Sequence, residues 1–172
     1  MLKIRPYRKN DSRVIVTWCN DPNAFYKWSA GIYGNFPLSA EKLEQAVSGR
    51  YDNERYFPYT AFDENGAVGY FTLRQPDNDP SVLRFGFVIL SPEVRGKGYG
   101  KQMLRLGMKF AFELYGADKV TLGVFENNPA AYHCYRAVGF TETGQSSFYE
   151  ICGEQWKCIE LELKRSEQWD MR

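Results

Sequence analysis

The part of the chain best suited to bind an anion is the glycine-rich basic stretch Arg95-Gly96-Lys97-Gly98-Tyr99-Gly100-Lys101. Its glycines leave backbone amides uncovered and tolerate unusual backbone angles. The apolar spacing after Gly98 predicts a helix, whose first amides are unpaired and whose dipole is positive at that end. The stretch therefore predicts a phosphate site, to which Arg95, Lys97 and Lys101 add positive charge. A solvated, flexible basic turn is the alternative that this stretch alone leaves open.

The spacing of the glycines excludes two common nucleotide-binding motifs. A P-loop needs a glycine five residues before its Gly-Lys pair, and Ser91 holds that place relative to Gly96-Lys97. The dinucleotide fingerprint Gly-x-Gly-x-x-Gly needs a third glycine, which neither Lys101 nor Met103 supplies. That fingerprint also opens a parallel βαβ unit, whereas this stretch follows a predicted antiparallel meander. The turn is therefore expected to bind a phosphate group in a way that differs from a P-loop and from a dinucleotide-binding fold.

A second group of candidate residues begins at Asn128-Pro129, a pair that favours a helix start because Asn caps helices and Pro suits their first turn. Tyr135 lies two turns further along this helix. A tyrosine has a pKa near 10 and an alkyl thiol one near 8.5, so a tyrosine hydroxyl can protonate or hydrogen-bond a departing thiolate. Packing of Tyr135 on the sheet is the alternative.

A group that can remove a proton is the usual partner of such a proton donor. Glu126 is the candidate base because it stands at the end of a predicted strand, close to Asn128; a solvated surface glutamate is the alternative. His133 and Cys134 are neighbours on a helix, where side chains point about 100° apart, so they do not form a nucleophilic pair. A single histidine and the lack of a Cys-x-x-Cys pair predict no metal site.

Both groups of residues resemble the motifs of one family. Arg95-x-x-Gly98-x-Gly100 matches the Gln/Arg-x-x-Gly-x-Gly/Ala signature of the GNAT superfamily of acyl-CoA N-acyltransferases. Asn128-x-x-Ala131-x-x-x-Tyr135-x-x-x-Gly139-Phe140 resembles the second motif of that superfamily. The resemblance extends from Val82 to Leu163, and the subgroup that looks closest acetylates ribosomal-protein N-termini and related small amines.

The resemblance implies an acetyltransferase that moves the acetyl group of acetyl-CoA directly to a primary amine: a protein N-terminus, a lysine-like amine or a small-molecule amine. It implies that the amides of residues 95–101 hold the pyrophosphate and that backbone groups of Val88 and Leu90 pair with the pantetheine arm. It also implies that Asn128 lies at the thiol end and that Tyr135 is the general acid. A non-catalytic acyl-CoA-binding or regulatory module is the alternative. A domain whose basic turn contacts nucleic-acid phosphates or a protein is a more distant one.

The helices and strands that must position these residues are predicted to form one domain over residues 1–172. We expect an α+β fold of three layers (α/β/α), with a mixed, mostly antiparallel sheet of six to seven strands. A helical crossover predicts that 82–90 and 119–125 run parallel, and the resemblance implies that this pair splays, with helices on both faces. The other predicted strands are 2–7, 56–62, 68–73, 140–142 and 157–163, and the predicted helices are 11–18, 39–49, 98–115 and 129–138.

Composition limits the partners and the compartment. A formal net charge of +1 argues against binding nucleic acid through a global basic field, and no apolar run approaches the roughly 20 residues that span a bilayer. The four cysteines are expected to be reduced thiols in a cytoplasmic protein, either monomer or homodimer. Glu150 and Glu154 are expected in the loop before the last strand, and the resemblance implies that this loop borders the acceptor.

Aromatic residues crowd the N-terminal third of the chain. They could line a pocket for a peptide end, an aromatic amine or a polyamine, or pack in the core and at a dimer contact. The residues are Phe25, Tyr26, Trp28, Tyr33, Phe36, Tyr51, Tyr56, Phe57 and Tyr59.

Overall fold

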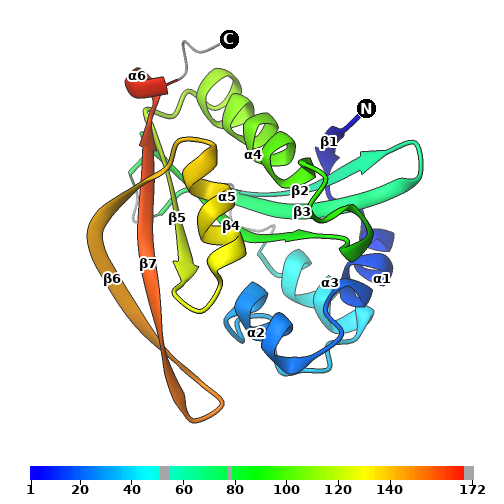
Figure 1. The fold of residues 1–172 in the computed structure, drawn as a ribbon. Helices are drawn as coiled ribbons and strands as arrows, with labels where there is room; N and C mark the ends of the chain where they lie inside the picture. The colour runs from blue at the N-terminus through cyan, green and yellow to red at the C-terminus, as the bar shows by residue number, and fades with distance from the viewer. Residues whose placement is uncertain (51–54, 77–78, 169–172) are drawn as a thin grey trace.

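A mixed sheet of seven strands runs through the protein (Figure 1). The computed structural model describes residues 1–50, 55–76 and 79–168. In space the strands follow the order β1-β2-β3-β4-β5-β7-β6, and only β4 and β5 run parallel. The strands are Lys3–Pro6 (β1), Tyr56–Asp63 (β2), Gly66–Arg74 (β3), Val82–Leu90 (β4), Lys119–Phe125 (β5), Thr141–Ile151 (β6) and Glu154–Lys164 (β7).

Helices cover both faces of this sheet, so the predicted three-layer α+β fold is confirmed (Figure 1). On one face Leu104 of α4 packs in a core with Phe85 and Leu122 of the parallel strands. On the other face Leu43 of α3 packs in a second core with Tyr70 of β3. The helices are Ser12–Ile15 (α1), Pro22–Ser29 (α2), Ala40–Ser48 (α3), Tyr99–Lys109 (α4), Pro129–Ala137 (α5) and Arg165–Gln168 (α6).

Three of the four predicted helices form close to their expected bounds. The Ser39 hydroxyl accepts from the Lys42 amide at 3.2 Å and so caps α3. Helix α4 continues through one wider turn, Phe110–Leu114, until Gly116 ends it with a φ of +71°. Asn128 accepts from the Ala131 amide at 3.4 Å and caps α5, as its residue type predicts.

The helix predicted over residues 11–18 forms in pieces. Residues 12–15 are an α-helix with Asp11 at its N-cap, and residues 16–18 continue it as a 3-10 turn. A further helix then begins at Asp21-Pro22. The Asp21 carboxylate accepts from the Ala24 amide at 2.8 Å and Pro22 occupies the first turn, so this stretch starts α2.

The parallel strands separate as predicted. Strand pairing between β4 and β5 covers three residue pairs and ends at Arg84 and Thr121, while both strands continue. Beyond that point β4 carries a bulge. The register of its pairing with β3 shifts there, and Phe87 adopts a φ of +51°. The sheet is therefore open between the second halves of β4 and β5.

The last two strands are longer than predicted. Strands β6 and β7 form one hairpin of 11 residues on each side, joined at Cys152 and Gly153, which have φ values of +50° and +81°. Glu150 and Glu154 therefore lie in strands and not in a loop, which corrects that expectation. Strand β6 is an edge strand whose residues are mostly exposed, so it lacks the apolar alternation by which a strand is recognised.

Most of the N-terminal aromatic residues pack in the two cores and do not line a pocket. The hydroxyl of Tyr33 hydrogen-bonds those of Tyr56 and Tyr70, and all three residues are buried. Phe57 stacks on Tyr115 beneath the opposite face of the sheet. The core alternative therefore holds for most of this set, while Tyr51 lies outside the described residues.

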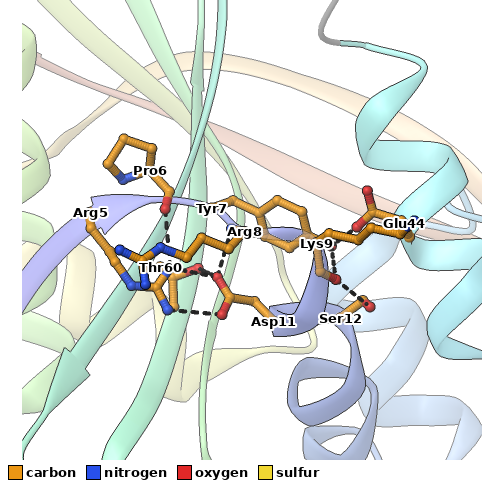
Figure 2. Close-up of polar contacts among 9 residues, drawn as sticks. All are labelled: Arg5, Pro6, Tyr7, Arg8, Lys9, Asp11, Ser12, Glu44 and Thr60. Carbon is orange, nitrogen blue, oxygen red and sulfur yellow. Dashed lines mark hydrogen bonds and ion pairs between the residues drawn. The ribbon is translucent and has the colours of Figure 1, made fainter.

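A buried carboxylate fixes the N-terminal strand to the rest of the sheet (Figure 2). Asp11 accepts two hydrogen bonds from the Arg5 guanidinium at 2.7 and 2.9 Å. It also accepts from the Arg8 amide at 2.8 Å and from the Thr60 hydroxyl of β2 at 2.7 Å. Burial by itself would raise the pKa of Asp11, but these donors outweigh burial and lower it.

We expect Asp11→Asn to reduce the free energy of unfolding by about 3 kcal/mol at pH 7, because Arg5 keeps a charge without its partner. A carboxyl whose pKa is lowered by folding stabilises the protein above its unfolded pKa of about 3.9, and that stabilisation is lost as the pH falls through the folded value. The wild type should therefore lose more stability than the variant between pH 5 and pH 2, measured by urea unfolding.

Glu64→Gln is the control, because the ion pair of Glu64 with the N-terminal amine joins side chains that are 86% and 73% exposed. Removing such a pair should change stability by less than about 1 kcal/mol. Equal losses in the two variants would contradict the role given to Asp11.

Candidate active site

A cleft of about 720 Å³ opens where β4 and β5 separate. One wall is the second half of β4, including Val88 and Leu90, and the opposite wall is β5 with α5. The turn that leads into α4 closes one end, and α2 lies along the side with Lys27 and Trp28. The two predicted motifs therefore meet across a single cleft.

The glycine-rich turn presents its backbone to this cleft. Gly96 and Gly98 have φ values of +73° and +82°, which any other residue adopts only with strain, and both line the cleft. Gly98 is the N-cap of α4, so the unpaired amides of the helix start at this wall. Gly100 also lines the cleft, and a Cβ there would lie 3.2 Å from the Cys134 sulfur of α5.

The charged and aromatic residues of the turn have different positions. Lys101 and Arg95 line the cleft, and the Arg95 guanidinium donates to the carbonyls of Leu90 at 3.0 Å and Trp18 at 3.2 Å. Arg95 thus holds the turn against the end of β4. Lys97 is exposed and Tyr99 donates to Asp63 at 2.9 Å, and neither side chain lies along the cleft.

Tyr135 and Asn128 line the cleft opposite β4. The Tyr135 side chain is 7% exposed and packs edge-on against Phe140. Burial raises the pKa of Tyr135 above its usual value of 10, so its hydroxyl keeps its proton at neutral pH. A protonated hydroxyl in an apolar wall can donate to an anion that forms beside it.

The structure does not bring Glu126 to the cleft. Its side chain is 63% exposed and lies 3.6 Å from the Lys157 ammonium. Among the described residues that line the cleft, none is an aspartate or a glutamate. In the part of the chain that the structure covers, no cluster of three or more His, Cys, Asp or Glu is arranged to hold a metal ion.

Sequence reasoning missed the part that α2 plays in the site. The Trp28 indole donates to the Phe87 carbonyl at 2.8 Å, which ties α2 to the bulge of β4. Lys27 beside it lines the cleft. The signal that could have found them is Asp21-Pro22, a capped helix start four residues before the aromatic run.

Comparisons with known proteins agree with this arrangement. The family model of the acetyltransferase (GNAT) domain matches residues 1–141. The spermidine N(1)-acetyltransferase of Vibrio cholerae is 28% identical over 144 residues, covering 83% of this chain and 80% of the relative. That of Escherichia coli K12 is 26% identical over 144 residues, covering 84% and 75%.

A solved structure shares the whole fold. The spermidine N-acetyltransferase from Vibrio cholerae in complex with CoA and spermine superposes with a TM-score of 0.81 at 22% identity, covering 96% of each chain. No helix in the described ranges is long and apolar enough to cross a membrane. With the family model matching most of its length, the chain belongs to the GNAT acetyltransferases and is an enzyme that transfers the acetyl group of acetyl-CoA to an amine.

Proposed function

We propose that the cleft holds acetyl-CoA with its pyrophosphate on the amides of residues 96–101 and its pantetheine arm along Val88 and Leu90. The observation that carries this proposal is the loss of pairing between β4 and β5 beyond Arg84, which leaves one side of β4 open to a ligand. The Leu90 carbonyl already accepts from Arg95, so pairing at Leu90 would share that oxygen. This position puts the thioester between the β4 bulge and Tyr135.

The amine acceptor then attacks the acetyl carbon. A nitrogen–carbon bond forms, the carbon–sulfur bond breaks, and the electron pair leaves with the sulfur. We propose that Tyr135 donates its proton to this thiolate. The ammonium form of the acceptor must release two protons over the reaction, of which one ends on the thiol of CoA and one in solvent. Glu126, the base expected from the sequence, is exposed, pairs with Lys157 and does not line the cleft, so we propose that the second proton passes to water.

The proposed acceptor is the primary amine of a small polyamine such as spermidine. This rests on the relatives that are named for acetylating spermidine. All four cysteines carry free thiols, which supports the proposal that the protein works in the reducing cytoplasm. Monomer and homodimer both stay open, and the near-neutral net charge supports a protein without a nucleic-acid partner.

A thiol-release assay with acetyl-CoA tests the transfer. The panel is spermidine, spermine, putrescine, lysine and a tripeptide with a free N-terminal alanine, and we expect the polyamines to release CoA fastest. We also expect acetyl-CoA at 100 times its dissociation constant to stabilise the fold by about 2.7 kcal/mol, raising the melting temperature by several degrees. Stabilisation without thiol release from any amine would favour the non-catalytic binding module instead.

A further inference from the structure

An ion pair lies on the face of the sheet opposite α4, beside the end of the cleft. The Arg84 guanidinium of β4 reaches across β5 and donates to both carboxylate oxygens of Glu160 on β7, at 2.7 and 3.0 Å. The two side chains are 20% and 22% exposed. Burial would lower the pKa of Arg84, but Glu160 outweighs burial and raises it, so the guanidinium stays charged.

A glycine lets this pair approach the cleft. Gly123 of β5 lines the cleft and is the strand partner of Glu160. A Cβ at residue 123 would lie 2.8 Å from the Arg84 Nη2 and 3.2 Å from the Glu160 Oε1. Gly86 lines the cleft from β4, also without a side chain. The atom nearest to such a Cβ at residue 123 is the Cys158 sulfur, at 2.7 Å. Cys158, Arg84 and Glu160 therefore pack directly on the Gly123 backbone, which places the Glu160 carboxylate against the wall of the cleft.

The charges around the cleft distinguish its two substrates. The charged side chains on its wall are the cations Lys27, Arg95 and Lys101, which suit the phosphates of CoA and repel an ammonium. Of the described carboxylates, Glu160 has its oxygen against cleft-lining Gly123. A carboxylate has about four lone-pair positions, so two bonds from Arg84 leave Glu160 able to accept from an ammonium.

We infer that Glu160 binds the ammonium of the acceptor: the amine approaches the thioester from the open face of the sheet, past Gly123, with Arg84 holding the carboxylate in place. This inference rests on the proposed function and names the residue that recognises its second substrate. Glu160, and not Glu150 or Glu154 as the sequence suggested, is then the acidic residue on the acceptor side. It lies on the strand next to β5, where the lack of a side chain at Gly123 lets its carboxylate pack against the wall of the cleft.

Glu160→Gln tests the inference by steady-state kinetics with the amine of the panel that releases thiol fastest. A glutamine keeps the shape and removes the charge, so we expect KM for the amine to rise at least about 10-fold. The dissociation constant of acetyl-CoA should change by less than about 2-fold, because its phosphates bind elsewhere in the cleft. The amine KM should also lose its dependence on ionic strength.

Glu162→Gln is the matched control. Glu162 lies two residues along β7 on the same face, is 24% exposed, and pairs with Lys119 at 3.3 Å. We expect this variant to keep the amine KM of the wild type. Because Glu160→Gln leaves Arg84 unpaired and costs stability, the double variant Arg84→Met/Glu160→Met provides a second measurement: it leaves no unpaired charge, and its amine KM should rise as well.

The outcomes separate the two proposals. If wild-type protein releases thiol and Glu160→Gln keeps the amine KM, or if Glu162→Gln raises it equally, the inference is overturned and the proposed function stands. If acetyl-CoA binds and no amine of the panel releases thiol, the proposed function fails and this inference fails with it.

Discussion

Tyr135→Phe is expected to lower kcat about 100-fold, which is the lower end of the contribution of a positioned general acid. The variant removes one hydroxyl from the cleft wall and keeps the ring that packs against Phe140. The departing thiolate then has to take its proton from solvent. Since burial raises the pKa of Tyr135 above 10, the wild-type enzyme should also keep its proton donor at pH 9.

Binding measurements distinguish this role from a packing role. The dissociation constant of acetyl-CoA, measured by calorimetry, should change by less than about 3-fold in Tyr135→Phe, and the melting temperature should stay within about 2 °C of the wild type. Tyr132→Phe is the control: Tyr132 lies one turn earlier on α5, and its hydroxyl donates to exposed Glu142 at 2.6 Å. A kcat that Tyr135→Phe leaves unchanged removes Tyr135 from the mechanism.

The second large effect is expected at the glycine turn. Gly98→Val should weaken acetyl-CoA binding at least about 100-fold, because a β-branched side chain is strained at a φ of +82° and would also cover the amides that we propose hold the pyrophosphate. Calorimetric titration with CoA measures the loss.

Gly116→Val separates strain from obstruction. Gly116 ends the same helical segment with a φ of +71°, and a Cβ there would meet no atom within 4 Å. Gly116 does not line the cleft. Both valine variants should lose similar stability, and only Gly98→Val should lose CoA binding. Equal weakening of binding in both would mean that helix strain, and not access to the amides, explains the effect.

Local signals in the sequence were enough to predict the cleft. The glycines of the turn, the cap at Asn128 and the crossover between 82–90 and 119–125 act within a few residues or through one helix, and each is present in the structure. The periodicities predicted a sheet of six to seven strands, and seven form. The family motifs then joined the two ends of the cleft, although they lie more than 30 residues apart.

Contacts between residues far apart in the sequence could not be predicted from it. Glu160 lies in no motif that would single it out in the sequence, and its partner Arg84 is 76 positions away. Glu126 looked suitable because it is close to Asn128 along the chain, yet its side chain points to Lys157. Strand β6 was underestimated because an edge strand with exposed faces needs no apolar alternation.

The short pairing between β4 and β5 has a consequence for how the width of the cleft is maintained. Three residue pairs cannot set the separation of two strands that diverge beyond them, so the spacing depends on the helix wedged beneath both. That helix sits close because Gly107 faces Phe85, where a Cβ would lie 2.6 Å from the ring. The width of the cleft therefore also depends on the packing of the core, and in particular on Gly107, which does not itself line the cleft.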